Sequence, residues 1–82
     1  MPTDPASQRA LGKAAAARRR ELGLTQEQLA NESGLHQRWI SNLETGRRNP
    51  SYVSLKRLAA ALNLPTSELI ARAEAIEKAF DR

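Results

Sequence analysis

Polar side chains suited to recognising the edges of nucleic-acid bases cluster in one short stretch of the chain. Gln37, Arg38 and Asn42 can each form a pair of hydrogen bonds in one plane. Arg matches the two acceptors of guanine, and Gln or Asn matches adenine, at about 1–3 kcal/mol of discrimination for each pair. On an arbitrary helix such residues would more often form a solvated face. Whether these side chains can read bases therefore depends on the helices that position them.

Catalytic or metal-binding chemistry has few residues available. The chain has no cysteine and a single histidine, His36, which leaves neither a nucleophile–base pair nor a cluster at metal-ligand spacing. No glycine-rich phosphate loop is present. The sequence predicts no enzyme activity, no cofactor and no metal site.

Basic charge is concentrated in residues 1–67 of the 82. They carry ten Lys and Arg against five Asp and Glu, whereas residues 68–82 carry three against four. This excess favours a polyanionic partner, although charge alone is a weak indicator. No apolar run approaches the roughly 20 residues of a membrane span, and the first residues lack a signal-peptide pattern, so we expect a cytoplasmic protein.

Caps and apolar spacing predict an all-α bundle of five short helices in one domain, residues 1–82. Asp4 and Pro5 begin the first helix, and the capping box of Thr25 and Gln28 begins the second. Ser51 caps the fourth. The expected helices span about 5–22, 26–33, 37–45, 52–62 and 66–80.

The stretch from Gln26 to Thr45 predicts two helices that cross steeply over a tight turn. The crossing needs a small residue, Ala30, and a turn glycine that can adopt positive φ, Gly34. The spacing is that of a DNA-binding helix-turn-helix, here residues 26–45. The apolar residues that fill the angle between the helices are Leu29, Leu35, Ile40 and Leu43.

From Leu11 to Leu69 the chain resembles the Xre-like, Cro and phage-repressor type of helix-turn-helix regulator, which has a lambda-repressor-like fold. A bare helix-turn-helix is moderately specific, but here an E-x-G-x-R-N-P loop and an L-A-x-A-L helix follow it. The chain is also similar to stand-alone regulators such as restriction–modification controller proteins, whose last helix pairs two subunits. The resemblance rests on LGLTQ at 22–26, LA at 29–30, GL at 34–35, ISNLETGRRNP at 40–50 and LAAAL at 58–62.

The resemblance implies a transcriptional regulator that binds double-stranded DNA at a pseudo-palindromic operator, with helix 37–45 in the major groove. Ile40 and Leu43 face the core, so the expected base-reading residues are Gln37, Arg38, Ser41 and Asn42. Contacts to the DNA backbone are expected from Gln26, His36, Trp39, Thr45, Arg47, Arg48 and Asn49.

Several of these residues also have an ordinary structural interpretation. Trp39 is expected to lie along a phosphate or sugar, with burial in the core as the alternative, and the loop at 47–49 can simply be solvated. In the family, Arg19 matches a residue that pairs with Glu44 and ties the first helix to the third, with surface charge as the alternative. Arg18 and Ser33 depart from the apolar residues often found at their positions.

An apolar stripe continues along helix 66–80 beyond the expected core, through Ala73, Ile76 and Phe80. An exposed stripe of this kind needs a cover. We expect that cover to be a second copy related by a two-fold axis, which makes the protein a homodimer. The alternative is that the helix folds back and buries Ile76 and Phe80 against the alanine-rich first helix.

A second function of the same fold competes with operator binding. The domain can act as an antitoxin or another protein-interaction module, with a toxin protein as its partner, and a regulator can also contact RNA polymerase. A single-stranded RNA reader is disfavoured because the chain lacks an aromatic stacking platform.

Overall fold

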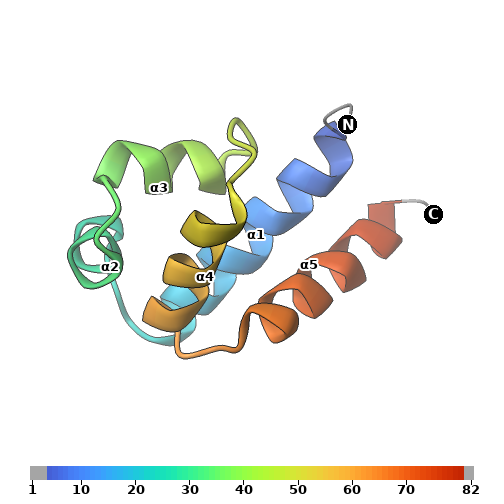
Figure 1. Ribbon diagram of the computed structural model, residues 1–82. Helices are drawn as coiled ribbons and strands as arrows, with labels where there is room; N and C mark the ends of the chain where they lie inside the picture. The colour runs from blue at the N-terminus through green and yellow to red at the C-terminus, as the bar shows by residue number, and fades with distance from the viewer. Residues whose placement is uncertain (1–3, 81–82) are drawn as a thin grey trace.

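The computed structural model describes residues 4–80, which form five α-helices and no strand (Figure 1). The all-α fold predicted from the sequence is confirmed, and the expected ends of the first, third and fourth helices move inward by one residue. Within the described residues, no helix is both long and apolar enough to cross a membrane. The helices are α1 (Pro5–Glu21), α2 (Gln26–Ser33), α3 (Gln37–Glu44), α4 (Tyr52–Ala61) and α5 (Thr66–Phe80).

Side-chain caps set where the helices begin. Thr25 Oγ1 accepts from the Gln28 amide at 3.0 Å, and Gln28 Oε1 accepts from the Thr25 amide at 2.8 Å, so the predicted capping box is present. Asp4 caps α1 and Ser51 caps α4, each through a side-chain oxygen. These contacts satisfy amides that the first helical turn leaves without a partner, and each contributes about 1 kcal/mol.

α3 and α5 both pack against α1. α1 and α5 run side by side in opposite directions, so α1 begins where α5 ends (Figure 1). Alanines such as Ala10 and Ala14 are buried on α1 and allow close approach. The other helices supply the large core residues, each stabilising the fold by roughly 1.5–3 kcal/mol through burial. The fully buried ones are Leu29, Ile40, Leu43, Leu58, Leu62 and Leu69.

Arg18 has a structural task at a position where an apolar residue is more usual in the family. Its Nε donates to the Leu62 carbonyl at the end of α4, at 2.9 Å. Its Nη1 lies 3.0 Å from Glu21 Oε1, which Arg72 of α5 also approaches at 3.4 Å. Arg18 therefore joins α1 to α4 directly and to α5 through Glu21.

Candidate nucleic-acid interface

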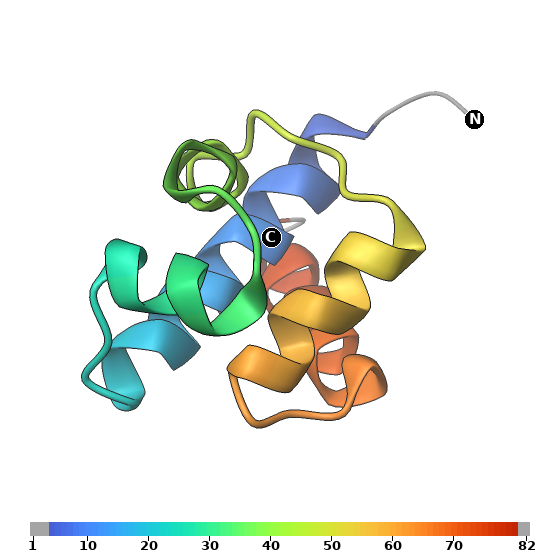
Figure 2. The ribbon, with the colours of Figure 1, turned by 60° about the vertical axis from the view of Figure 1, so that its left-hand side comes forward.

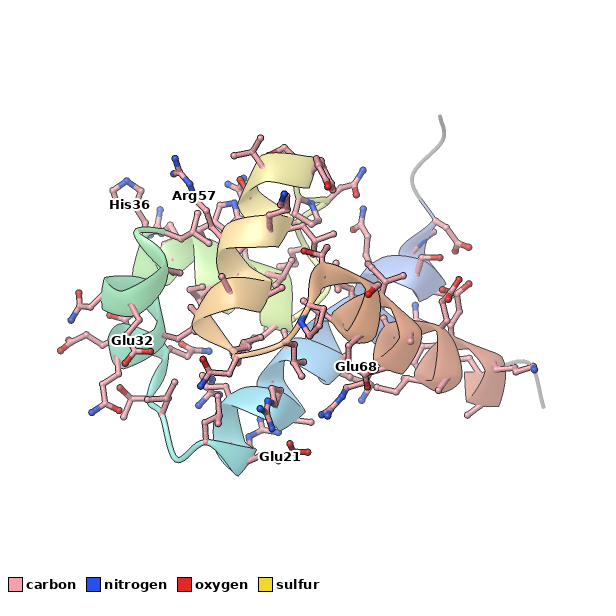
Figure 3. All side chains as sticks on the ribbon, turned by 60° about the horizontal axis from the view of Figure 1, so that its bottom comes forward. Glu21, Glu32, His36, Arg57 and Glu68 are labelled. Atoms are coloured by element: carbon pink, nitrogen blue, oxygen red, sulfur yellow. The ribbon has the colours of Figure 1, made fainter. Side chains whose placement is uncertain are left out.

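α3 lies at the surface with one face buried and the other open. Ile40 and Leu43 are completely buried, which fixes the rotation of the helix about its axis. Figure 3 shows the ring of His36, at the start of α3, pointing away from the bundle. The structure thus places the predicted base-reading residues on or beside the outer face of α3. His36, Gln37, Arg38 and Thr45 are exposed, and Ser41 and Asn42 are half-buried.

The turn between α2 and α3 has the geometry that the sequence indicates. Gly34 ends α2 with φ +73°, in the left-handed region that glycine adopts without strain. Ala30 is buried, as expected for the residue at the helix crossing. Ser33 is also buried, and its hydroxyl donates to the Ala30 carbonyl and accepts from the Leu35 amide, both at 3.2 Å. The buried hydroxyl of Ser33 therefore has hydrogen-bond partners both as a donor and as an acceptor.

Glu44, the last residue of α3, joins three helices. Arg19 of α1 reaches it with Nε 2.7 Å from Oε2 and Nη2 2.9 Å from Oε1, and Gln26 Nε2 of α2 donates to Oε1 at 3.0 Å. Arg19 also donates to the Leu24 carbonyl at 2.8 Å. The hydrogen bond to Glu44 raises the pKa of Arg19 above its ordinary value, against the opposing effect of burial. The arrangement fixes the tilt of α3 on the bundle.

Gln26, expected from the sequence to contact a DNA phosphate, has a hydrogen-bond partner within the protein, Glu44. Its side-chain amide carries two hydrogens, and one of them is directed at Glu44. The half-buried side chain is held at the first position of α2. This positioning role was missed because the partner is distant in sequence.

Gly12 is a further positioning residue that the sequence interpretation missed. It lies buried inside α1, where a Cβ atom would come within 2.3 Å of the Leu43 carbonyl oxygen and 2.8 Å of the Glu44 carbonyl oxygen. Only glycine lets the end of α3 approach α1 this closely. A glycine in the interior of an otherwise alanine-rich helix was the available signal, since it costs helix stability unless packing requires it.

Trp39 is half-buried and packs against the edge of the core. The Arg48 guanidinium carbon lies 5.6 Å from the centre of its ring, within the range of a cation–π contact. Trp39 and Arg48 line a shallow depression together with His36, Gln37 and Arg38. Trp39 therefore packs partly against the core, and its ring contacts Arg48 of the loop. Its expected contact with a phosphate or sugar stays a prediction.

The loop after α3 returns past α1 before α4 begins, as Figure 2 shows. Gly46 ends α3 with φ +76°, and the Arg47 amide donates to the Asn42 carbonyl at 2.8 Å. These contacts fix the backbone of the loop, while the side chains of Arg47, Arg48 and Asn49 remain exposed. The loop presents two cations beside α3.

The apolar stripe of α5 packs partly within its own protomer. Ala73 is 6% exposed and belongs to the core of that protomer. Ile76 is half-buried and packs on the same core, and Phe80 lies under Arg9 of α1, 5.2 Å from the guanidinium carbon to the ring centre. These contacts are those of the fold-back arrangement that we kept as the alternative, but both side chains remain half-buried, and pairing of two copies through them stays a prediction. The alanines of α1 leave room for it.

Candidate metal ligands are not clustered in the part of the chain that the structure describes. No group of three His, Cys, Asp or Glu side chains there is arranged to hold a metal ion. The features of the surface that remain are a polar helix face and adjacent arginines, which suit hydrogen bonding to bases and phosphates.

Comparisons with known proteins agree with this geometry. The model of the helix-turn-helix family HTH_3 matches residues 16–69. An uncharacterized HTH-type transcriptional regulator from Sinorhizobium fredii is 50% identical over 52 residues, covering 63% of this chain and 68% of its own length. The control protein C.MunI from Mycoplasma is 35% identical over 57 residues, covering 70% of this chain and 77% of its own.

Two solved structures are also similar to this chain. The clp gene regulator ClgR from Corynebacterium glutamicum has a TM-score of 0.87 at 27% identity, over 92% of this chain and 80% of that one. The restriction-modification controller protein C.AhdI from Aeromonas hydrophila has a TM-score of 0.74 at 37% identity, over 76% of this chain and 94% of that one.

Proposed function

The chain belongs to the HTH_3 helix-turn-helix family of DNA-binding transcriptional regulators, and from this membership we propose that it binds a pseudo-palindromic operator as a homodimer. In the proposed complex, α3 of each subunit lies in the major groove of double-stranded DNA. Gln37, Arg38, Ser41 and Asn42 read bases there.

The observation that carries the proposal is the division of α3 into two faces. Ile40 and Leu43 anchor the helix completely, whereas Gln37 and Arg38 are fully available at its first turn. A recognition helix of this type contacts base edges mainly through its N-terminal residues. The residues that can make paired hydrogen bonds are therefore at the end of α3 that would enter the groove.

In the proposed complex, residues on both sides of α3 contact the DNA backbone. Arg47, Arg48 and Asn49 extend from the loop after it, and His36 and Thr45 flank the helix itself. Arginine side chains at such positions neutralise phosphates and fix the register of a helix on the duplex without reading sequence. Arg48 is held in place by its contact with the Trp39 ring.

The shortness of α3 supports a two-fold assembly. Eight residues reach only a few base pairs, and two half-sites one helical turn apart roughly double the sequence that is read. An operator with matching two-fold symmetry is the expected target of such a homodimer.

Selection of bound sequences from a random pool of double-stranded DNA tests the proposal. We expect recovery of an inverted repeat, with half-sites about 10 base pairs apart centre to centre. Gel-shift titration should then show sequence-specific binding to the selected duplex and much weaker binding to a scrambled duplex of the same composition. Recovery of no common sequence would contradict operator binding.

A further inference from the structure

Two apolar side chains at the start of α4 are exposed in the protomer. Tyr52 is 68% exposed and Val53 is 59% exposed. Lys56, one helical turn later, places its Nζ atom 5.4 Å from the centre of the Tyr52 ring. We call Tyr52, Val53 and Lys56 the α4 knob. Large apolar side chains exposed next to one another are characteristic of contact surfaces.

A groove of about 390 Å³ lies between α1, α5 and the loop before α4. Its volume falls within the roughly 300–1,000 Å³ of pockets that hold drug-sized groups, so it has room for an aromatic side chain. Each helix contributes residues at spacings of three and four, which form one continuous helix face. The α1 wall is Asp4, Ser7, Gln8 and Leu11, the α5 wall is Ile70, Ala73, Glu74 and Glu77, and Asn49 and Pro50 complete the lining.

The charges of the groove and of the α4 knob are complementary. The groove combines apolar residues with the carboxylates of Asp4, Glu74 and Glu77, in a chain whose net charge is +4. Among residues 4–80, none of these three acids takes part in an ion pair, and neither does Lys56. The groove fits an apolar surface that carries a cation, and the α4 knob has that composition.

The α4 knob is also next to the groove. Pro50, which lines the groove, precedes Tyr52 by two residues. On the α2 side of α4, Arg57 and Ala61 line a separate depression with Glu32 and Ser33. At 3.6 residues per turn, Tyr52 lies roughly 140° around α4 from Arg57, on the flank away from α2. Because the two patches are neighbours, a two-fold axis that passes between them can place the knob of each subunit against the groove of the other.

We propose that a second copy of this chain binds at this surface, with the α4 knob of each subunit seated in the groove of the other. The contact is isologous, because the same two patches meet twice about a two-fold axis. It rests on the homodimer proposed above and assigns it a surface other than the Ile76 and Phe80 flank of α5 expected from the sequence. The loop at 47–49 leads directly into this surface, so the phosphate-binding loops of both subunits flank the axis. This arrangement directs both α3 helices toward one side of the DNA.

Charge reversal across the interface tests the proposal. Lys56→Glu places a carboxylate on the knob, where it faces the acidic groove of the other subunit. The double variant Glu74→Lys, Glu77→Lys places two ammonium groups in the groove, where they face Lys56 of the other subunit. By analytical ultracentrifugation, we expect each variant to dimerise at least about tenfold more weakly than the wild type. In a mixture of the two, each knob meets a groove of opposite charge at both contacts. The mixture should therefore form heterodimers, which a merely structural role of these residues would not produce.

Val53→Asp supplies an independent variant that retains the fold. An acidic residue in the first turn is favourable for the helix, so circular dichroism should remain that of the wild type. Its dimer should weaken at least about tenfold, because a carboxylate then faces the acidic groove. Lys13→Glu and Glu27→Lys, exposed outside both patches, are the matched controls and should dimerise normally.

Two results would overturn the assignment. One is a wild-type chain that stays monomeric at every concentration. The other is a dimer that survives the knob and groove variants but is broken by Ile76→Asp or Phe80→Asp, which would put the interface on the flank of α5 that carries Ile76 and Phe80. Binding to a duplex with a single half-site separates this proposal from operator binding. A monomeric variant that still binds the half-site leaves DNA recognition intact, whereas a normal dimer that binds no DNA refutes the proposed function alone.

Discussion

Arg19 and Glu44 form a two-point ion pair between α1 and the last residue of α3, although 25 residues separate them in the chain. Their side chains are only 12% and 7% exposed. Charge-assisted hydrogen bonds with little access to water are stronger than surface pairs, and a buried charge without a partner is costly. The pair, which the family resemblance implied, is therefore a determinant of the position of α3.

Glu44→Ala should lower the free energy of unfolding by about 1–3 kcal/mol, because it leaves Arg19 and Gln26 without their shared acceptor. Chemical denaturation monitored by circular dichroism measures the loss. Glu32→Ala, which removes an exposed acid from α2, is the control and should stay within about 0.5 kcal/mol of wild type. Equal midpoints for Glu44→Ala and wild type would show that the pair does not hold the fold.

Gly12→Ala should destabilise the protein even though alanine is the better helix former. Its added methyl group would meet the Leu43 and Glu44 carbonyl oxygens, and overpacking of this kind costs about 1–3 kcal/mol or more. Thermal unfolding provides the measurement. Lys13→Ala, the exposed neighbour, serves as the control. A higher melting temperature for Gly12→Ala would mean that α3 does not approach α1 so closely.

Arg38→Ala and Gln37→Ala should each relax base preference at one position of each half-site, by about 1–3 kcal/mol, while helicity is retained. Repeating the DNA selection with each variant measures the change. Arg20→Ala removes an exposed cation from α1, away from α3, and should leave the preference unaltered. If both α3 variants selected the wild-type sequence, the base-reading assignment would fail.

Salt should weaken DNA binding steeply, because released counterions drive the contact. With on the order of three phosphate contacts in each subunit, the log–log slope for a dimer is about −5. The double substitution Arg47→Ala, Arg48→Ala should flatten this slope in a fluorescence-anisotropy titration and preserve sequence preference. An unchanged slope would remove the loop from the backbone contacts.

Acid should weaken the contact between α1 and α5 through Glu21. Hydrogen bonds from Arg18 first, and from Arg72 second, hold the pKa of Glu21 below its ordinary value of 4.5. A depressed folded-state pKa stabilises the fold above the unfolded value, and this contribution disappears as the pH falls through the folded value. In an NMR titration, Arg18→Ala should raise the pKa of Glu21 more than Arg72→Ala does. The reverse order would contradict this ranking.

Local signals predicted much of this structure because they depend on neighbours in the chain. Thr25, Gly34 and Ser51 cap or end helices through contacts within a few residues, so sequence alone places those boundaries. The rotation of α3 likewise follows from the spacing of Ile40 and Leu43. The corresponding face of polar residues could therefore be identified before any coordinates.

Contacts between distant residues account for what the sequence did not predict. The fit of Gly12 under α3 and the bond from Gln26 to Glu44 have no local signature, because they exist only once α1, α2 and α3 are packed. The stripe on α5 is a similar case. Its spacing predicts a buried face, but the spacing does not reveal that α1 of the same protomer covers part of it.

The two-faced construction of α3 also bears on how such a regulator diverges. The residues that hold the helix in the bundle and the residues offered to DNA are separate sets, joined only through the backbone. After gene duplication, substitutions at 37, 38, 41 and 42 can accumulate on one copy with little penalty to folding, since surface changes usually cost less than about 0.5 kcal/mol. A copy can thus acquire a new operator while keeping its scaffold, and two paralogues in one cell can come to control different genes.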